Sequence, residues 1–234
     1  MSASGAFAQE LVIPEVRYPA LPATAANAEG FVPSGWAIER RAGGDLNGDG
    51  AADLAFVLRM RDPANILSHD GLGNNPFDTN PRILGVAFAA AGRYRLAVEN
   101  NVLIPRRDFP TQEDPFFGED AEFSIAHGAL RLSLYRFMNA GGWDMGPTTF
   151  TFRWQAGALR LIGYDFVNVQ RNSGRMTSLS INYLTRRVRT ATGNVGSDAE
   201  QVRWTRLRPA PLPTIEQIGD GLEFDPEGLL GRLP

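Results

Sequence analysis

One short stretch of the chain carries oxygen-bearing side chains at the spacing of a calcium loop. Residues 44 to 54 read Gly-Asp-Leu-Asn-Gly-Asp-Gly-Ala-Ala-Asp-Leu, which places Asp45, Asn47, Asp49 and Asp53 at positions 1, 3, 5 and 9, with Gly50 at position 6. Calcium takes about six to eight oxygen ligands, and alternate residues of a tight loop can direct their oxygens at one centre. Glycine at position 6 permits the sharp turn that such a loop needs. The spacing therefore predicts a Ca²⁺ site.

Two further positions distinguish this loop from a helix-loop-helix EF-hand. Position 7 is Ala51, which would bind the ion through its backbone carbonyl. Position 12 holds a bidentate Glu in an EF-hand, but here it is Phe56, inside an apolar run. Asp53 is therefore the expected last protein ligand, and we expect a strand on each side of the loop. The alternative is an acidic surface turn without metal.

The segment from Asp45 to Leu54 resembles the calcium loop of FG-GAP repeats, the blade motif of integrin-α-type β-propellers. The surrounding sequence resembles a group of exported bacterial proteins in which one such loop precedes a β-rich remainder, through the segments Phe31–Trp36, Asp70–Gly73, Asn80–Leu84, Thr149–Trp154 and Leu161–Tyr164. The resemblance covers residues 31 to 190 and implies a periplasmic or surface-attached protein. A propeller repeats its motif in each blade, whereas this chain carries it once.

The composition is that of a globular protein and excludes several functional classes. The chain has 234 residues, of which 43% are hydrophobic, and a net charge of −3. Because it has no cysteine, disulfides, thiolate zinc sites and cysteine nucleophiles are excluded. A pI near 5.5 argues against binding to nucleic acid. No apolar run reaches the roughly 18 residues that a membrane-spanning helix requires, and all 23 basic residues are arginine.

Period-two alternation of apolar and polar residues predicts antiparallel strands. Leu130, Leu132 and Leu134 share one face of such a strand. We expect residues 83–90 to pair with 94–98 across a turn at 91–93, and residues 149–154 to pair with 159–161 across Ala156 and Gly157. Further strands are expected at 54–58, 178–183 and 201–207, and helical spacing occurs only near 214–219. The predicted fold class is mainly β, a single domain of antiparallel strands (a meander, a sandwich or an incomplete propeller) with little helix.

The ends of the chain read differently from its middle. Ala6-Phe7-Ala8 before Gln9 has the small-x-small pattern of a signal-peptidase site. We therefore expect a signal-peptide remnant at 1–8, an extended lead-in at 9–30, the β domain at 31–210 with the calcium loop at 45–53, and a tail at 211–234. The long connections at 61–81, 104–119 and 139–147 are expected to be functional or held in place by other groups. The expected location is the periplasm or outside the cell.

Three further groups of polar residues could have a catalytic or binding function, but their patterns are less specific. Ser68, His69 and Asp70 are adjacent on a loop, which does not suit a catalytic triad assembled from distant segments, and His127 before Gly128 reads as a turn. Asp70, Asn74, Asn75 and Asp78 could supply a second metal site but match no loop template. Five carboxylates surround Phe116 and Phe117 and could serve glycoside hydrolysis or flank an aromatic contact for a partner or sugar: Glu113, Asp114, Glu119, Asp120 and Glu122.

Six arginines near the end of the β region could form a basic stripe on neighbouring strands: Arg186, Arg187, Arg189, Arg203, Arg206 and Arg208. They could bind an anionic polymer or lipopolysaccharide, or form an ordinary solvated face. The first functional hypothesis is a calcium-stabilised exported protein that binds a protein or glycan partner without catalysis. The second is a carboxylate-using hydrolase of cell-wall or exogenous polysaccharide, and the third is a periplasmic inhibitor or immunity protein.

Overall fold

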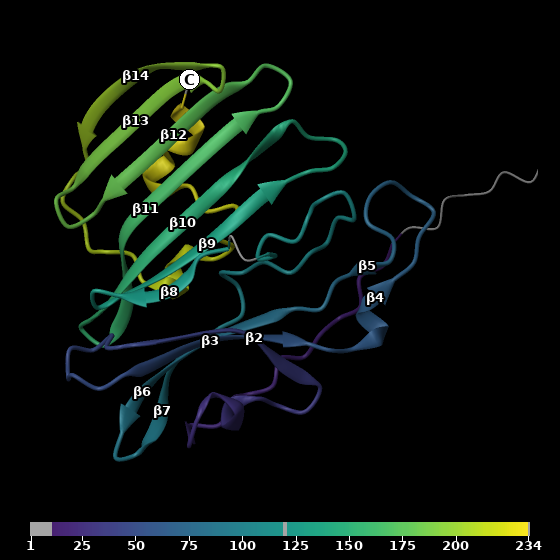
Figure 1. Ribbon diagram of the computed structural model, residues 1–234, viewed down its shortest axis with the longest axis vertical. Helices are drawn as coiled ribbons and strands as arrows, with labels where there is room; N and C mark the ends of the chain where they lie inside the picture. The colour runs from purple at the N-terminus through teal and green to yellow at the C-terminus, as the bar shows by residue number, and fades with distance from the viewer. Residues whose placement is uncertain (1–10, 119–120, 234) are drawn as a thin grey trace, which may run out of the picture.

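The computed structural model describes residues 11–118 and 121–233 and is built from antiparallel sheets (Figure 1). Strands account for 48% of it and helices for 8%, which confirms the prediction of a mainly β fold with little helix. The expected signal-peptide remnant at 1–8 lies outside the described residues.

Fourteen strands are defined in the part of the chain that the structure describes: β1 (Thr24–Ala25), β2 (Trp36–Gly44), β3 (Asp53–Met60), β4 (Ile66–Leu67), β5 (Phe77–Asp78), β6 (Arg82–Ala90), β7 (Arg93–Asn100), β8 (Phe123–Ala126), β9 (Ala129–Phe137), β10 (Asp144–Gln155), β11 (Ala158–Gln170), β12 (Arg175–Asn182), β13 (Arg187–Asn194) and β14 (Ser197–Arg206). The helical segments are short: η1 (Ala28–Phe31), η2 (Pro63–Asn65), α1 (Ile215–Ile218), η3 (Pro226–Gly228) and η4 (Leu230–Arg232).

The larger sheet is a meander in which neighbours in sequence are neighbours in space. Its seven strands run in the order β14-β13-β12-β11-β10-β9-β8, all antiparallel. The predicted hairpin of β10 and β11 is confirmed, with Gln155 opposite Ala158. Its two turn residues, Ala156 and Gly157, both have positive φ, which is the type I′ geometry that matches the twist of paired strands. His127 and Gly128 make the same turn between β8 and β9.

The smaller sheet has the strand order β1-β7-β6-β3-β2 and carries the loop of interest. The predicted β6–β7 hairpin is confirmed and turns at Ala91 and Gly92. Seven consecutive residues of β6 are buried, because both faces of this sheet are covered. Residues of the predicted lead-in, including Leu21 and Ala25, pack on one face with Phe31 and Phe56.

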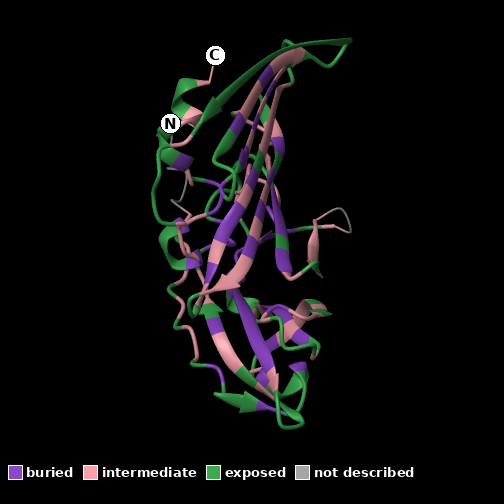
Figure 2. Ribbon diagram, turned by 90° about the vertical axis from the view of Figure 1, so that its left-hand side faces the viewer, coloured by how far each residue is buried: buried purple, intermediate pink, exposed green. Residues whose placement is uncertain are grey.

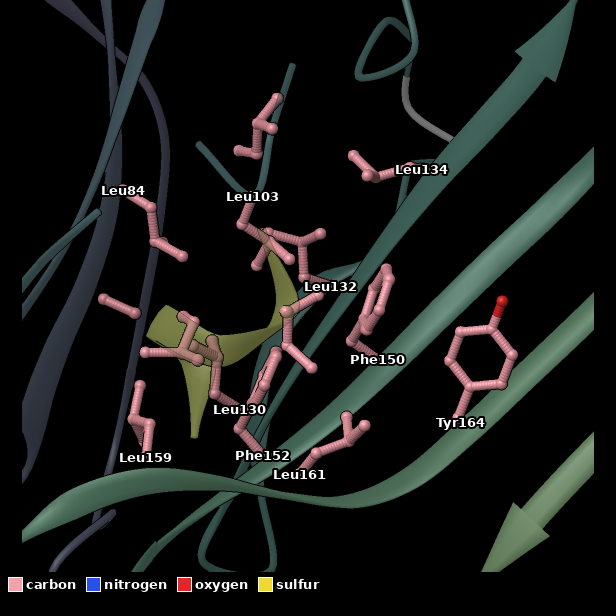
Figure 3. Packing of buried hydrophobic residues seen from close by; sticks show 14 of the residues in the cluster. Leu84, Leu103, Leu130, Leu132, Leu134, Phe150, Phe152, Leu159, Leu161 and Tyr164 are labelled. Carbon is pink, nitrogen blue, oxygen red and sulfur yellow. The ribbon is translucent and has the colours of Figure 1, made fainter. Parts of the chain in front are cut away.

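The principal hydrophobic core lies where the two sheets meet (Figure 3). Leu84 comes from the smaller sheet, whereas Leu130, Phe150 and Phe152 come from the larger one, and all four are almost completely buried. Because one core joins the two sheets, the described residues pack as one unit. Figure 2 shows that burial fades toward the far end of the larger sheet, where every residue of β14 is exposed.

The segment after β14 returns across one face of the larger sheet. Ile215, Ile218 and Leu222 are buried in the principal core, and Leu229 and Leu233 pack against it farther along. Figure 1 shows this segment, in yellow, behind strands β11 to β13. The larger sheet therefore has an inner face that the C-terminal segment partly covers and an opposite, outer face.

Candidate metal centre

The predicted calcium loop joins the ends of two paired strands. β2 ends at Gly44 and β3 begins at Asp53, and these two residues stand opposite each other in the sheet. The strand-loop-strand arrangement expected from the sequence is therefore present. Phe56 is completely buried within β3, so position 12 serves the hydrophobic core.

The exposed side chains of the loop fold back onto its own backbone. The two carboxylate oxygens of Asp45 accept hydrogen bonds from the N–H groups of Gly48 (2.7 Å) and Gly50 (2.9 Å). Asp49 accepts one from the N–H of Ala51 (2.8 Å), and Asn47 accepts one from the N–H of Asp49 (2.9 Å). These bonds wrap the backbone around the acidic groups, and positive φ at Gly48 and Gly50 permits the two tight turns.

The electrostatics of the loop favour an ionised Asp45. The hydrogen bond from Gly48, followed by that from Gly50, lowers the pKa of this carboxyl below its usual value. Hydrogen bonds to the charged form stabilise that form. An ionised, solvent-facing carboxylate is the state that a hard cation requires.

Asp53 differs from the other predicted ligands because it is completely buried. One of its carboxylate oxygens accepts a hydrogen bond from the N–H of Leu46 (2.9 Å), at the start of the loop. The other accepts one from the N–H of Ala89 (3.0 Å), near the end of β6. Asp53 therefore fastens the loop to the neighbouring strand.

The donor types fit calcium, but their side chains are not gathered around one point. Within residues 11–118 and 121–233, no group of three or more His, Cys, Asp or Glu side chains is placed to hold a metal ion. The predicted set of Asp45, Asn47, Asp49 and Asp53 with the carbonyl of Ala51 supplies only oxygen donors, as calcium prefers. In this arrangement Asn47 donates from its amide nitrogen to Asp49 (3.0 Å). Binding would require the amide oxygen of Asn47 to turn toward the ion.

The residues near His69 stabilise a loop and do not form a relay. The Nε2 atom of His69 lies 2.9 Å from the carbonyl oxygen of Asn74, and its Nδ1 atom accepts a hydrogen bond from Gly71 (3.1 Å). The ring packs edge-on against Phe77. Both ring nitrogens are thus used to shape the loop. His127 is a turn residue, as the sequence predicts.

The polar residues considered for a second metal site are also tied into the loop. Asp78 accepts hydrogen bonds from the backbone and side chain of Asn80 and pairs with Arg59. Asn74 donates to Glu113, and Asn75 donates to the carbonyl of His69. Asn74, Asn75 and Asp78 therefore stabilise the loop through these hydrogen bonds and this ion pair.

The described members of the acidic stretch contact different partners. Asp114 is buried against arginines, Glu113 accepts from Asn74 and Asn139, and Glu122 pairs with Arg131. Glu119 and Asp120 lie outside the described residues. Of the two adjacent aromatic side chains, Phe116 is anchored in the core while Phe117 is 78% exposed.

A buried cluster of charges between β2, β3 and β6 was not predicted from the sequence. Arg82, with 2% of its side chain exposed, contacts Glu39 (2.6 Å) and Asp114 (2.7 Å). Arg59 also contacts Glu39 and Asp114, and in addition Asp78. The only sequence signal for this cluster was the presence of Arg59 and Arg82 within apolar strand sequences, and their acidic partners are distant in the chain. Through Asp114 this cluster holds the 104–119 connection against the smaller sheet.

The pKa of Asp114 reflects two opposing effects. Burial alone would raise it, but the guanidinium of Arg82, together with the N–H of Phe116, brings it below its usual value. Burial disfavours a lone carboxylate, whereas an adjacent positive charge favours it. Asp114 is therefore held ionised as part of the structural cluster.

Of the six arginines at the end of the β region, four lie on β13 and β14, whereas Arg186 and Arg208 lie outside these strands. The structure divides them by face, because Arg189 stands opposite Trp204 and Arg187 stands opposite Arg206, whereas Arg203 stands opposite Thr190. Arg189 is paired with Glu200 at 2.6 Å. The predicted stripe is thus smaller than the sequence suggests.

Comparison of the chain with protein-family models, curated proteins and solved structures finds no match. The candidate function therefore depends on the loop and the surfaces described above. In the described part of the chain, no helix has the length and apolar character needed to cross a membrane.

Proposed function

We propose that this is an exported, calcium-stabilised binding protein without a catalytic role. The observation that carries the proposal is the β2–β3 loop, where oxygen donors stand at calcium-loop spacing between two paired strands. Asp45, Asn47 and Asp49 would bind the ion through side-chain oxygens and Ala51 through its carbonyl. Asp53, whose carboxylate accepts hydrogen bonds from Leu46 and Ala89, would add an oxygen at the base of the loop.

One observation supports binding over hydrolysis. The described carboxylates of the acidic stretch are engaged separately, with Asp114 in a buried ion pair and Glu122 paired with Arg131. A glycosidase needs two carboxylates facing one bond, about 5 to 10 Å apart.

The proposal of export rests on the Ala6-Phe7-Ala8 pattern and on the abundance of calcium outside the cell. Amino-terminal sequencing of the natural product tests it: a start near Gln9 supports export, and an intact Met1 start contradicts it.

Thermal unfolding in calcium and in excess chelator tests the metal site. Extracellular calcium modules bind with dissociation constants of about 10⁻⁴ to 10⁻³ M. A calcium concentration about 100-fold above the dissociation constant would add about 2.7 kcal/mol to the stability of the folded state. For a chain of this size, that gain raises the unfolding midpoint by about 5 to 10 °C.

The variant Asp49→Ala removes an exposed ligand and is expected to abolish the calcium-dependent rise. Asp108→Ala is the matched control, because it removes an exposed carboxylate outside the loop and should keep the full rise. Asn172→Ala serves in the same way as a control for Asn47→Ala. An unchanged wild-type midpoint in calcium and in chelator would show that the loop is only an acidic turn.

A further inference from the structure

The outer face of β13 and β14 carries a compact basic and aromatic surface. Arg187 lies directly opposite Arg206, and the guanidinium carbon of Arg187 is 4.4 Å from the centre of the Trp204 ring. Trp204 is 55% exposed. We call Arg187, Trp204 and Arg206 the arginine–tryptophan patch.

The strand register places this patch on the face away from the C-terminal segment. Val188 is buried in the principal core, so Arg187 and Arg189 on either side of it point outward. Trp204 and Arg206 stand opposite these two arginines and share their face. Arg203 instead lines a groove with Leu229 and Leu233, on the inner face.

The patch carries positive charge that no described carboxylate neutralises. Among residues 11–118 and 121–233, the ion pairs of the larger sheet's arginines are those of Arg131, Arg136 and Arg189. Like charges directly opposite on a sheet repel each other. An anion bound between Arg187 and Arg206 would relieve that repulsion and accept charge-assisted hydrogen bonds.

The two rows of the outer face that include Arg187 and Arg189 are lined mostly by short polar side chains, whereas the next row includes Val202, Ala191 and Val167. In the row that ends at Arg187, the register continues through Asn182, Gly163 and Thr151. In the adjacent row Ser180 donates to the carboxylate of Asp165 at 2.6 Å, and the hydroxyl groups of Ser133 and Thr149 lie 2.7 Å apart. These two rows therefore offer several hydrogen-bonding groups.

We propose that the arginine–tryptophan patch binds an acidic polysaccharide of the polyuronate type. Arg187 and Arg206 contact its carboxylates, because the guanidinium fork matches a carboxylate in shape and charge. Trp204 packs against a sugar ring, and the hydroxyl and amide groups of the neighbouring rows bind sugar hydroxyls. This inference rests on the proposed binding function and names its partner class, but its residues are separate from the calcium loop.

The surface chemistry favours a polysaccharide over the other polyanions. A peripheral membrane site combines cations with several inserting apolar side chains, whereas the row that ends at Arg187 and the row next to it carry mostly polar side chains. Nucleic-acid binding uses an extended basic footprint, whereas this chain has a net charge of −3 and the positive charge is local. Binding to vesicles and to DNA is therefore measured alongside binding to the polysaccharide.

Affinity electrophoresis in gels containing polygalacturonate measures the binding. Neutral dextran, vesicles containing phosphatidylglycerol and double-stranded DNA are compared in parallel sedimentation and gel-shift assays. Chelator is present throughout, so that the result does not depend on calcium at the β2–β3 loop. The wild type is expected to bind polygalacturonate and not dextran, with binding weakened by added salt because the contacts are exposed.

Four variants locate the site. Arg187→Ala combined with Arg206→Ala is expected to weaken binding about tenfold or more, and Trp204→Ala should weaken it without any change in charge. Arg206→Ala is compared with Arg203→Ala, which removes the same charge from the other face of β14 and should change binding less than about twofold. Circular dichroism and unfolding midpoints verify that each variant is folded.

The proposal is overturned if polygalacturonate does not bind the wild type, or if Arg203→Ala weakens binding as much as Arg206→Ala. It is also overturned if vesicles or DNA bind more tightly than polygalacturonate through the same residues. If the wild type binds polygalacturonate but its unfolding midpoint is the same in calcium and in chelator, only the metal proposal is refuted.

Discussion

Replacing Asp53 separates a structural role of this carboxylate from its role as a metal ligand. Asp53→Ala leaves the N–H groups of Leu46 and Ala89 without their acceptors. A buried donor that loses its partner costs about 1 to 3 kcal/mol. Because the bond to Leu46 is buried and that to Ala89 only partly so, we expect a total loss of about 2 to 4 kcal/mol.

The assay is thermal unfolding in excess chelator, followed by circular dichroism. A loss of this size lowers the midpoint by roughly 5 to 15 °C in a chain of this length. Asp49→Ala, in the same loop but exposed, should stay close to the wild type in chelator, because most surface substitutions change stability by less than about 0.5 kcal/mol. In calcium, both variants should lack the metal-dependent rise. A midpoint for Asp53→Ala equal to that of the wild type in chelator would refute the proposed bridging role.

Two further predictions concern the smaller sheet. Asp114→Asn removes one partner of the buried charge cluster and should cost about 3 to 5 kcal/mol at pH 7, whereas Glu200→Gln in the exposed pair should cost less than about 1 kcal/mol. Because the pKa of Asp114 is lowered in the folded state, ionised Asp114 contributes fully to the free energy of unfolding above about pH 4, and this contribution disappears as the pH falls through the pKa of the folded state. The free energy of unfolding should therefore change less with pH in acid for Asp114→Asn than for the wild type. Gly85→Ala would place a methyl group against the ring of Phe56, and denaturant unfolding should show a loss of about 1 to 3 kcal/mol. Gly43→Ala, which has room for the methyl group, should lose no stability, and an equal loss in both variants would contradict the packing explanation.

Features that depend on neighbouring residues were predicted well from the sequence. Alternation along 130–134 and 149–154 identified β9 and β10, and Ala156-Gly157 identified the hairpin turn between β10 and β11. The loop at 45–53 was recognised because its donors are close in sequence. The metal it was predicted to bind stays a prediction.

Features created by long-range pairing were not predicted. β2 was expected only from the loop that follows it, because its sequence contains Glu39, Arg40 and Arg41 and lacks the apolar alternation of a half-buried strand. The partners of Arg82 lie 43 and 32 residues away in the chain, and local patterns cannot identify them. The second role of Asp53 was missed for the same reason, since the N–H of Ala89 is 36 residues away.

The consecutive strand order of the larger sheet bears on how the chain folds. Each new strand from β9 onward pairs with the one made just before it, often across a two-residue turn, so each step closes a short loop at little entropic cost. The lead-in is different: Leu21 binds the side chain of Glu99, 78 residues later, and Pro14 accepts from Arg106, 92 residues later. The C-terminal segment also makes contacts of long range, since the N–H of Gly221 donates to the carbonyl of Leu103, so such contacts occur toward both ends of the described residues. During synthesis on the ribosome, Pro14 and Leu21 must wait until Arg106 and Glu99 have been made before these contacts exist, while strands β8 to β14 can add in turn.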